Sequence, residues 1–268
     1  MSIATLQYRP QRIAELRQQV RDRMLRESPC TRQPNFIRVS AADLLLLYRL
    51  YDELFFNGVI QSMLMDKTHR PLALKVSQAM TSSGGRTLRL RRRDLSGALQ
   101  THYEIAISAR LLFNSFKNND RSIHVSGQLC TDRLDAMMRI MEHELVHLIE
   151  MLSFGDSSCK KTRFLTIADR IFGHTHAAHR LITPRERAAT EHKLRSGDEV
   201  EFTFEGQTLR GRINRINTRA TVLVPDPRGL RYTDGNHYAR YYVPLSRLIP
   251  LVRSFVVGAQ APDAGTVQ

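Results

Sequence analysis

Met141-Glu142-His143-Glu144-Leu145-Val146-His147-Leu148 is the stretch that decides the fold and the chemistry of this chain, because it contains the pattern H-E-x-x-H. On a helix, His143 and His147 lie one turn apart on the same face, where both imidazoles can bind one metal ion. Glu144 lies on the neighbouring face, within reach of the proton of a metal-bound water. The stretch therefore predicts a metal site with a general base beside it.

The surrounding sequence predicts a helix from about residue 132 to residue 155. Thr131 or Asp132 can cap its start, Gly155 marks its end, and no proline falls between them. Apolar residues recur at spacings of three and four, as on the buried side of a helix. They are Leu134, Met137, Met138, Met141, Leu145, Leu148 and Leu152. We therefore expect a largely buried helix whose metal-binding face opens into a cleft.

The composition indicates a protein without a membrane segment. The chain has 268 residues, enough for one large domain or two small ones, and 42% of them are apolar. The N-terminus lacks an apolar signal region, and the longest apolar run, Leu44 to Leu47, is too short to cross a bilayer. Cys30, Cys130 and Cys159 form no C-x-x-C pair, which favours a reducing compartment. The expected location is the cytoplasm.

The formal net charge is +14, and most of the excess is arginine. Arginine suits contacts with phosphate, so we expect DNA as a partner and association with the nucleoid as a second expectation for location. The alternative interpretation is that the charge only keeps the protein soluble. The candidate nucleic-acid-binding residues are a dense cluster and two positions on a later strand: Arg86, Arg89, Arg91, Arg92 and Arg93, then Arg210 and Arg212. We favour a patch that follows a phosphate backbone, and a solvated hairpin is the alternative interpretation of the cluster.

The first part of the chain predicts an α+β domain. Residues 1–38 form a basic helical arm with a helix over 10–27, which either contacts phosphates or packs on the body. Residues 39–182 form the main domain, in which helices pack on a small, mostly antiparallel sheet. Its expected helices cover 40–56, 109–116, 132–155 and 160–172, and its expected strands cover 72–76, 86–90 and 103–108. We expect the strand 103–108 at the edge of the sheet, where it could pair with an extended substrate.

The second part predicts a small all-β barrel over residues 183–252. Short strands are expected at 199–204, 208–216, 220–224 and 238–243, separated by turns such as Glu205-Gly206 and Asp234-Gly235. The tail, 253–268, is small and polar and is expected to be disordered.

The order of motifs from about residue 40 to residue 176 resembles the SprT-like (Spartan-type) metalloprotease family. The residues that carry the resemblance are Leu47-Tyr48, Phe55-Phe56-Asn57-Gly58, Thr81-Ser82-Ser83-Gly84-Gly85-Arg86, Glu104-Ile105-Ala106-Ile107-Ser108, His143-Glu144-Leu145-Val146-His147 and Phe172-Gly173-His174-Thr175. The resemblance implies a zincin-like domain and a zinc-dependent protease; several members digest proteins attached to DNA. The barrel would then be an added SH3-like module, in place of the zinc ribbon that some members carry.

The third metal ligand departs from the family pattern. The family supplies it from a His-Gly pair shortly before a Phe, and counting back from Phe164 this pair falls on Lys160 and Lys161. The neighbouring Cys159 offers a thiolate, which is a good zinc ligand. His174 is the alternative, but it lies at the other end of a predicted helix, about 20 Å away. We favour Cys159, with an inert packed thiol as the third reading.

These patterns lead to two hypotheses for function. In the first, His143, His147 and Cys159 hold Zn, and Glu144 acts as the catalytic base in the hydrolysis of peptide bonds; the expected protein substrates are DNA-associated ones. In the second, the chain is a nucleic-acid-binding protein whose zinc site is structural and closed by four ligands. A further alternative makes the barrel a module that binds proteins instead of DNA.

Overall fold

The computed structural model describes residues 3–93, 97, 99–117 and 121–251, and it is an α+β structure. The chain forms two compact units, Met1–Pro184 and Arg185–Gln268. The tail predicted to be disordered, 253–268, lies outside the described residues. Among the described helices, none combines the length and the apolar character needed to cross a lipid bilayer.

A three-stranded sheet forms one layer of the first unit. Its order is β1 (Ala73–Ser77), β3 (Leu99–Ser108), β2 (Gly85–Arg93), with β3 parallel to β1 and antiparallel to β2. The prediction of β3 as an edge strand is therefore wrong, because β3 is paired on both sides. Ile105 and Ile107 of this central strand are buried in the core.

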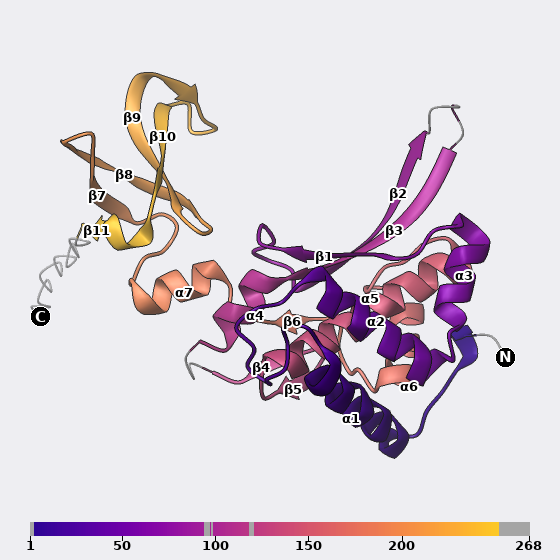
Figure 1. Cartoon of the computed structure of the whole chain (residues 1–268). Helices are drawn as coiled ribbons and strands as arrows, with labels where there is room; N and C mark the ends of the chain where they lie inside the picture. The colour runs from indigo at the N-terminus through magenta and orange to yellow at the C-terminus, as the bar shows by residue number, and fades with distance from the viewer. Residues whose placement is uncertain (1–2, 94–96, 98, 118–120, 252–268) are drawn as a thin grey trace, which may run out of the picture. The chain divides into compact units, whose positions relative to one another are not determined.

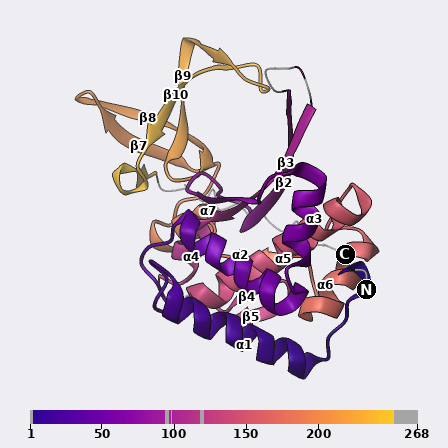
Figure 2. The same ribbon diagram turned by 45° about the vertical axis from the view of Figure 1, so that its right-hand side comes forward.

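Helices cover one face of this sheet (Figures 1 and 2). The helices α2 (Ala41–Phe56) and α5 (Arg133–Phe154) pack against the strands, and α1 (Pro10–Glu27) packs on these helices. Helix α1 buries the apolar stripe expected from its sequence, which consists of Ile13, Leu16, Val20 and Met24. Of the two alternatives for the N-terminal arm, the structure thus shows a helix that packs on the body.

The other elements of the first unit are shorter. They are η1 (Ile3–Thr5), α3 (Val59–Thr68), α4 (Ala109–Ser115), α6 (Thr162–Phe172) and a second sheet of order β5 (Gln128–Cys130), β4 (Ile123–Val125), β6 (His179–Arg180). In this second sheet β4 pairs with both neighbours in antiparallel fashion. The sheet matters for the site because β4 and β5 pack against α5.

Both ends of α5 are fixed by their sequence. Asp132 is the N-cap, and its side chain accepts a hydrogen bond from the backbone N–H of Asp135 at 2.9 Å. Arg21 of α1 donates to the Asp132 carboxylate at 2.7 and 3.2 Å. Gly155 closes the helix with a φ of 81°, a conformation that favours glycine. The helix that carries the motif is thus held at both ends and buried along most of its length.

The second unit contains one antiparallel sheet. Its order is β10 (His237–Val243), β9 (Ala220–Arg231), β8 (Gln207–Ile216), β7 (Glu199–Phe204), β11 (Ile249–Pro250). The short elements α7 (Pro184–Glu191) and η2 (Leu245–Arg247) complete the unit. One face of the sheet forms the core, which includes Val200, Phe202, Ile213 and Val222.

The prediction of a closed barrel is not met in the described residues. Closure requires pairing between β10 and β11, and these strands lie at opposite edges of the sheet. Strand β11 has two residues and, within the part of the chain that the structure describes, pairs with β7 alone. A strand this short offers too few backbone groups to close the sheet.

Candidate metal centre

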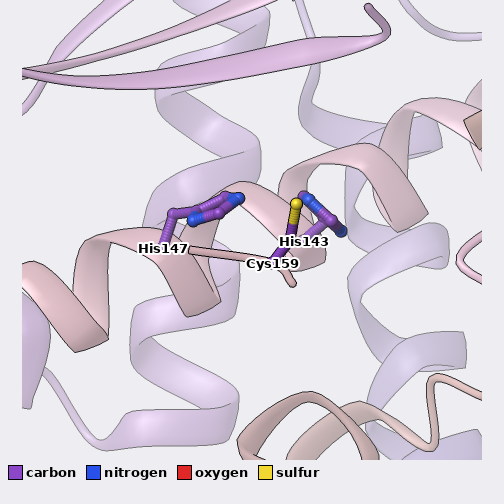
Figure 3. Close-up of side chains that lie close together, drawn as sticks. All are labelled: His143, His147 and Cys159. Atoms are coloured by element: carbon purple, nitrogen blue, oxygen red, sulfur yellow. The ribbon is translucent and has the colours of Figure 1, made fainter. Parts of the chain in front are cut away.

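Three side chains that can bind a metal converge beside α5. His143 and His147 lie one turn apart on the helix, with ring centroids separated by 4.9 Å. Cys159 comes from the turn between α5 and α6, because α6 begins at Thr162 and not at residue 160 as expected. One ligand atom from each residue lies within 4.8 Å of the other two, and the side chains point toward one another (Figure 3). This group can hold a metal ion.

The donor set has the size and chemistry of a transition-metal site. Ligands of a tetrahedral zinc lie roughly 3.5 Å from one another, as bond lengths of about 2.0 to 2.3 Å require. The observed spread is only about 1 Å wider, a difference that small side-chain rotations close. Two imidazoles and a thiolate suit zinc and other borderline-soft metals better than calcium or magnesium, which prefer oxygen ligands.

Hydrogen bonds to the Nδ1 atoms orient both imidazoles. Nδ1 of His147 lies 2.7 Å from Oγ of Ser157, which donates to Oε2 of Glu150 at 2.5 Å. Glu150 is itself held by Nε of Arg163 at 2.6 Å. Nδ1 of His147 is therefore engaged, and Nε2 remains for a metal. Such a relay fixes the tautomer of a ligating histidine.

A longer contact with Ser126 orients the imidazole of His143. Nδ1 of His143 lies 3.4 Å from Oγ of Ser126. Burial lowers the pKa of His147, and burial together with the nearby His179 lowers the pKa of His143 further. Both imidazoles are thus neutral at pH 7, the form that binds a metal.

Glu144 is buried next to these ligands against the start of β2. Oγ1 of Thr87 lies 2.8 Å from Oε2 of Glu144 and 3.0 Å from its backbone oxygen, so the hydroxyl donates to one of the two. A side chain at Gly85 would overlap the carboxylate, so only glycine leaves room for it. Burial raises the pKa of Glu144 to about 7, against the lowering effects of Thr87 and Arg86. Such a carboxylate is a stronger base than an exposed one.

These groups line a cleft of about 390 Å³. The start of β2 forms one wall, α5 forms the floor, and the turn with Cys159 and a further histidine, His179, complete the lining. The ring of His179 lies 4.4 Å from the ring of His143, measured between centroids. Burial lowers the pKa of His179 to about 4, so that this ring is also neutral at pH 7.

A network of charged groups fixes the opposite side of α5. Glu142 is fully buried and accepts two hydrogen bonds from Arg17 of α1, at 2.7 and 2.9 Å. Tyr51 donates to the same carboxylate at 2.7 Å. Burial alone would raise the pKa of Glu142, but Arg17 and Arg139 outweigh it and hold the pKa well below its usual value. The carboxylate is therefore ionised and ties α1 and α2 to the motif helix.

His174, the alternative third ligand, belongs to this network and not to the metal group. Its Nε2 lies 2.8 Å from Oε2 of Glu142, and its ring stacks on Phe172 at 5.6 Å. Its imidazole is therefore already engaged in the core. The structure brings Cys159, and not His174, to the two motif histidines.

The five arginines of β2 do not form one patch. Alternate residues of a strand face opposite sides, so Arg89, Arg91 and Arg93 share one face while Arg86 and Arg92 share the other. Arg89 donates to the backbone oxygen of Gly155 at 2.7 Å. The remaining cluster is exposed, and β2 and β3 extend beyond the helices at their far ends (Figure 1).

Arg210 and Arg212 lie on the outer face of the second unit's sheet. The pairing of strands places Arg240, Tyr238 and Tyr242 on the same face. Arg210 pairs with Glu201 at 2.9 Å and Arg212 with Asp234 at 3.6 Å, yet both arginines remain more than half exposed. This face therefore combines exposed arginines with tyrosines, and the carboxylates of Glu201 and Asp234 neutralise part of its positive charge.

Several residues of the site were not predicted from the sequence. Thr87 and His179 come from strands far from the motif, and only the fold brings them to it. Glu150 and Ser157 could have been noticed, because Glu150 follows His147 by three residues on a helix and Ser157 follows the helix end.

Comparison of the chain with models of protein families, with curated proteins and with solved structures gives no significant match.

Proposed function

We propose that the chain is a zinc-dependent endopeptidase with a zincin-like domain, as its resemblance to the SprT-like family implies. One observation carries the proposal: Glu144 lies in the same cleft as the group His143, His147 and Cys159. Three protein ligands are the number found in catalytic zinc sites, which keep a fourth position for water or substrate. A structural site, by contrast, has four protein ligands.

The roles of the residues follow from their chemistry. Zinc bound by the three ligands would lower the pKa of a water molecule and polarise the carbonyl of a peptide bond. Glu144 takes one proton from the attacking water as the C–O bond forms, and it delivers this proton to the nitrogen as the C–N bond breaks. The raised pKa of Glu144, about 7, suits both transfers, because the group must accept and release a proton near neutral pH.

The edge strand β2 supports a role in holding the substrate. The backbone N–H of Ser108 on β3 donates to the oxygen of Gly84 at 2.8 Å, so even-numbered residues of β2 are those bonded to β3. The backbone groups of Thr87 and Arg89 then face the free edge, next to the cleft. An extended peptide can pair with such an edge through main-chain hydrogen bonds, which gives cleavage that tolerates many sequences.

Nucleic acid is proposed as a partner that brings the protease to DNA-associated proteins. The support is the net charge of +14 together with two exposed sets of arginine, one on β2 and one on the outer face of the second unit. Tyr238 and Tyr242 add aromatic surface on that face, and Tyr242 is 62% exposed. Aromatic rings next to arginine suit nucleic acid, because bases stack on the rings while arginine contacts phosphate.

The test of the peptidase is Glu144→Gln. The variant should retain one zinc per chain, measured by metal analysis, and should cleave unstructured casein at least about 10³-fold more slowly, because it lacks the base. Glu205→Gln, at an exposed turn of the second unit, is the matched control and should cleave like the parent chain. A chelator should abolish cleavage, and added zinc should restore it. Undiminished cleavage by Glu144→Gln would refute the proposal; zinc retained without any cleavage by the parent chain would favour the nucleic-acid-binding alternative.

A further inference from the structure

His179 lines the cleft but has no part in the reaction as described so far. It lies on β6, opposite Val125 of β4 in the antiparallel pairing. Since β4 packs against α5, this pairing brings the imidazole to 4.4 Å from that of His143. A two-residue strand has little independent stability, so the position of His179 depends on β4.

The imidazole of His179 has an unsatisfied nitrogen. Its Nε2 is buried and has no hydrogen-bond partner among the residues that the structure describes. Buried polar atoms are nearly always paired, and because His179 lines the cleft, this nitrogen is available to a molecule that enters it. The metal group does not supply this partner, because its mutually close ligand atoms come from His143, His147 and Cys159 only.

Gly84 lies against the ring of His179 and leaves room for it because it has no side chain. A side chain at Gly84 would meet Nδ1 of His179 at 2.8 Å, closer than atoms in contact allow. Gly84 and Gly85 therefore leave room for two functional groups, His179 and Glu144, at the start of β2. Arg86 also lines the cleft, but it is exposed, so water screens its charge.

We propose that His179 donates a hydrogen bond from Nε2 to an oxygen atom of the molecule bound at the metal centre. The inference rests on the proposed peptidase function for the identity of that oxygen, which is the carbonyl oxygen of the peptide bond being cleaved. Attack of water converts this oxygen into an anion, and a donor already in place stabilises the anion more than the ground-state carbonyl. His179 is then a catalytic residue that acts on kcat.

The test uses the full chain loaded with cobalt(II), whose visible spectrum reports ligands at the metal. Titration with acetohydroxamic acid, an oxygen ligand, gives a dissociation constant without any need for a substrate. His179→Ala should bind the hydroxamate about 10-fold more weakly than the parent chain, because one hydrogen bond to a charged oxygen is lost. His179→Gln should recover part of the affinity, since its amide N–H can donate. His176→Ala, three residues before His179 and exposed, is the matched control and should bind like the parent chain.

A second measurement separates a donor from a ligand or a structural residue. His179→Ala should bind cobalt(II) within about twofold of the parent chain. On casein, its kcat should fall by about 10²-fold while KM changes little, as for the loss of one donor to an oxyanion. A fall in cobalt affinity of tenfold or more would make His179 a metal ligand and overturn the proposal, as would unchanged hydroxamate binding. If the parent chain binds cobalt and hydroxamate but never cleaves casein, the peptidase proposal fails, while the hydroxamate series still decides the role of Nε2.

Discussion

Two successive residues of α5, Glu142 and His143, point in different directions from the helix. Glu142 is bound by Arg17 and Tyr51 in the core, and His143 faces the cleft. The position of the imidazole therefore depends on a buried, ionised carboxylate one residue away. Removal of one partner from such a pair is strongly destabilising, because the remaining charge is buried without compensation.

Ser157 gives a sharper test of how single side chains position the metal ligands. Ser157→Ala removes the hydroxyl between Nδ1 of His147 and the carboxylate of Glu150. We expect zinc affinity to fall roughly 10- to 100-fold, as is typical when the partner of a ligating histidine is lost. Competition with a chromophoric chelator measures this change, and Ser158→Ala, in the same turn, serves as the control. Equal zinc affinities of the two variants would contradict the relay.

The N-terminus of α5 predicts a dependence of stability on pH. Burial alone would raise the pKa of Asp132, but the hydrogen bond from Arg21 and the capping bond outweigh it and lower this pKa. The folded state thus favours the ionised carboxylate. Its contribution is fully present above the unfolded pKa of about 3.9 and is lost as the pH falls through the lower folded value.

Asp132→Asn removes this charge and keeps an oxygen that can cap the helix. The variant should melt roughly 2–6 °C below the parent chain at pH 7, which corresponds to about 1–2 kcal/mol. The difference should shrink below about pH 4, because the parent chain then loses the same charge. Thermal unfolding followed by circular dichroism at several pH values measures it. A difference in melting temperature that stays constant from pH 7 to pH 3 would contradict the role of the charge.

Long periodic elements were predictable from sequence, and short ones were not. The stripe of α1 and the two ends of α5 are confirmed, because apolar spacing and caps act locally. Helix α3 was missed because Asn57 and Gly58 read as a stop. Both residues have positive φ, so the chain turns there and begins a new helix at once. Strand β6 was missed because two residues carry no pattern, and their pairing is set by β4.

The residues of the candidate site were likewise predictable where a local pattern marks them and not where only the fold brings them together. His143, Glu144 and His147 follow from a spacing within one helix, which any sequence displays directly. Thr87 and His179 lie more than 30 residues from the motif, and their approach requires both sheets to pack on α5. The sequence predicted β3 at the edge of the sheet, but the edge strands are β1 and β2. The order of strands is a property of the folded sheet, and alternation along one strand does not determine it.

The whole molecule carries a positive charge that should govern its affinity for nucleic acid. Binding of the full chain to a labelled DNA single strand and duplex should weaken steeply with salt, because each neutralised phosphate releases counterions. Arg91→Ala with Arg93→Ala, or Arg210→Ala with Arg212→Ala, should reduce the slope of log K against log salt by about 1 to 2 for the set that contacts phosphate. Fluorescence anisotropy measures both quantities.

Two other exposed arginines control for the change of net charge. Arg12 and Arg26 of α1 pair with Glu15 and Glu27, and their double alanine variant removes the same charge from a different surface. Its slope should stay within error of the parent chain. If all three double variants behaved alike, total charge alone would determine binding, and neither arginine set would form a binding surface.

The bidentate contact between Arg17 and Glu142 bears on where a recombinant fragment can begin. A fragment that starts at residue 39 keeps the whole H-E-x-x-H motif but deletes the guanidinium of Arg17, which neutralises the buried carboxylate of Glu142 next to His143. Such a truncation is expected to misfold, so the absence of peptidase activity in it would not test the proposed catalysis. Helix α1 therefore belongs to the same folding unit as the motif helix, although no residue of the motif lies in it.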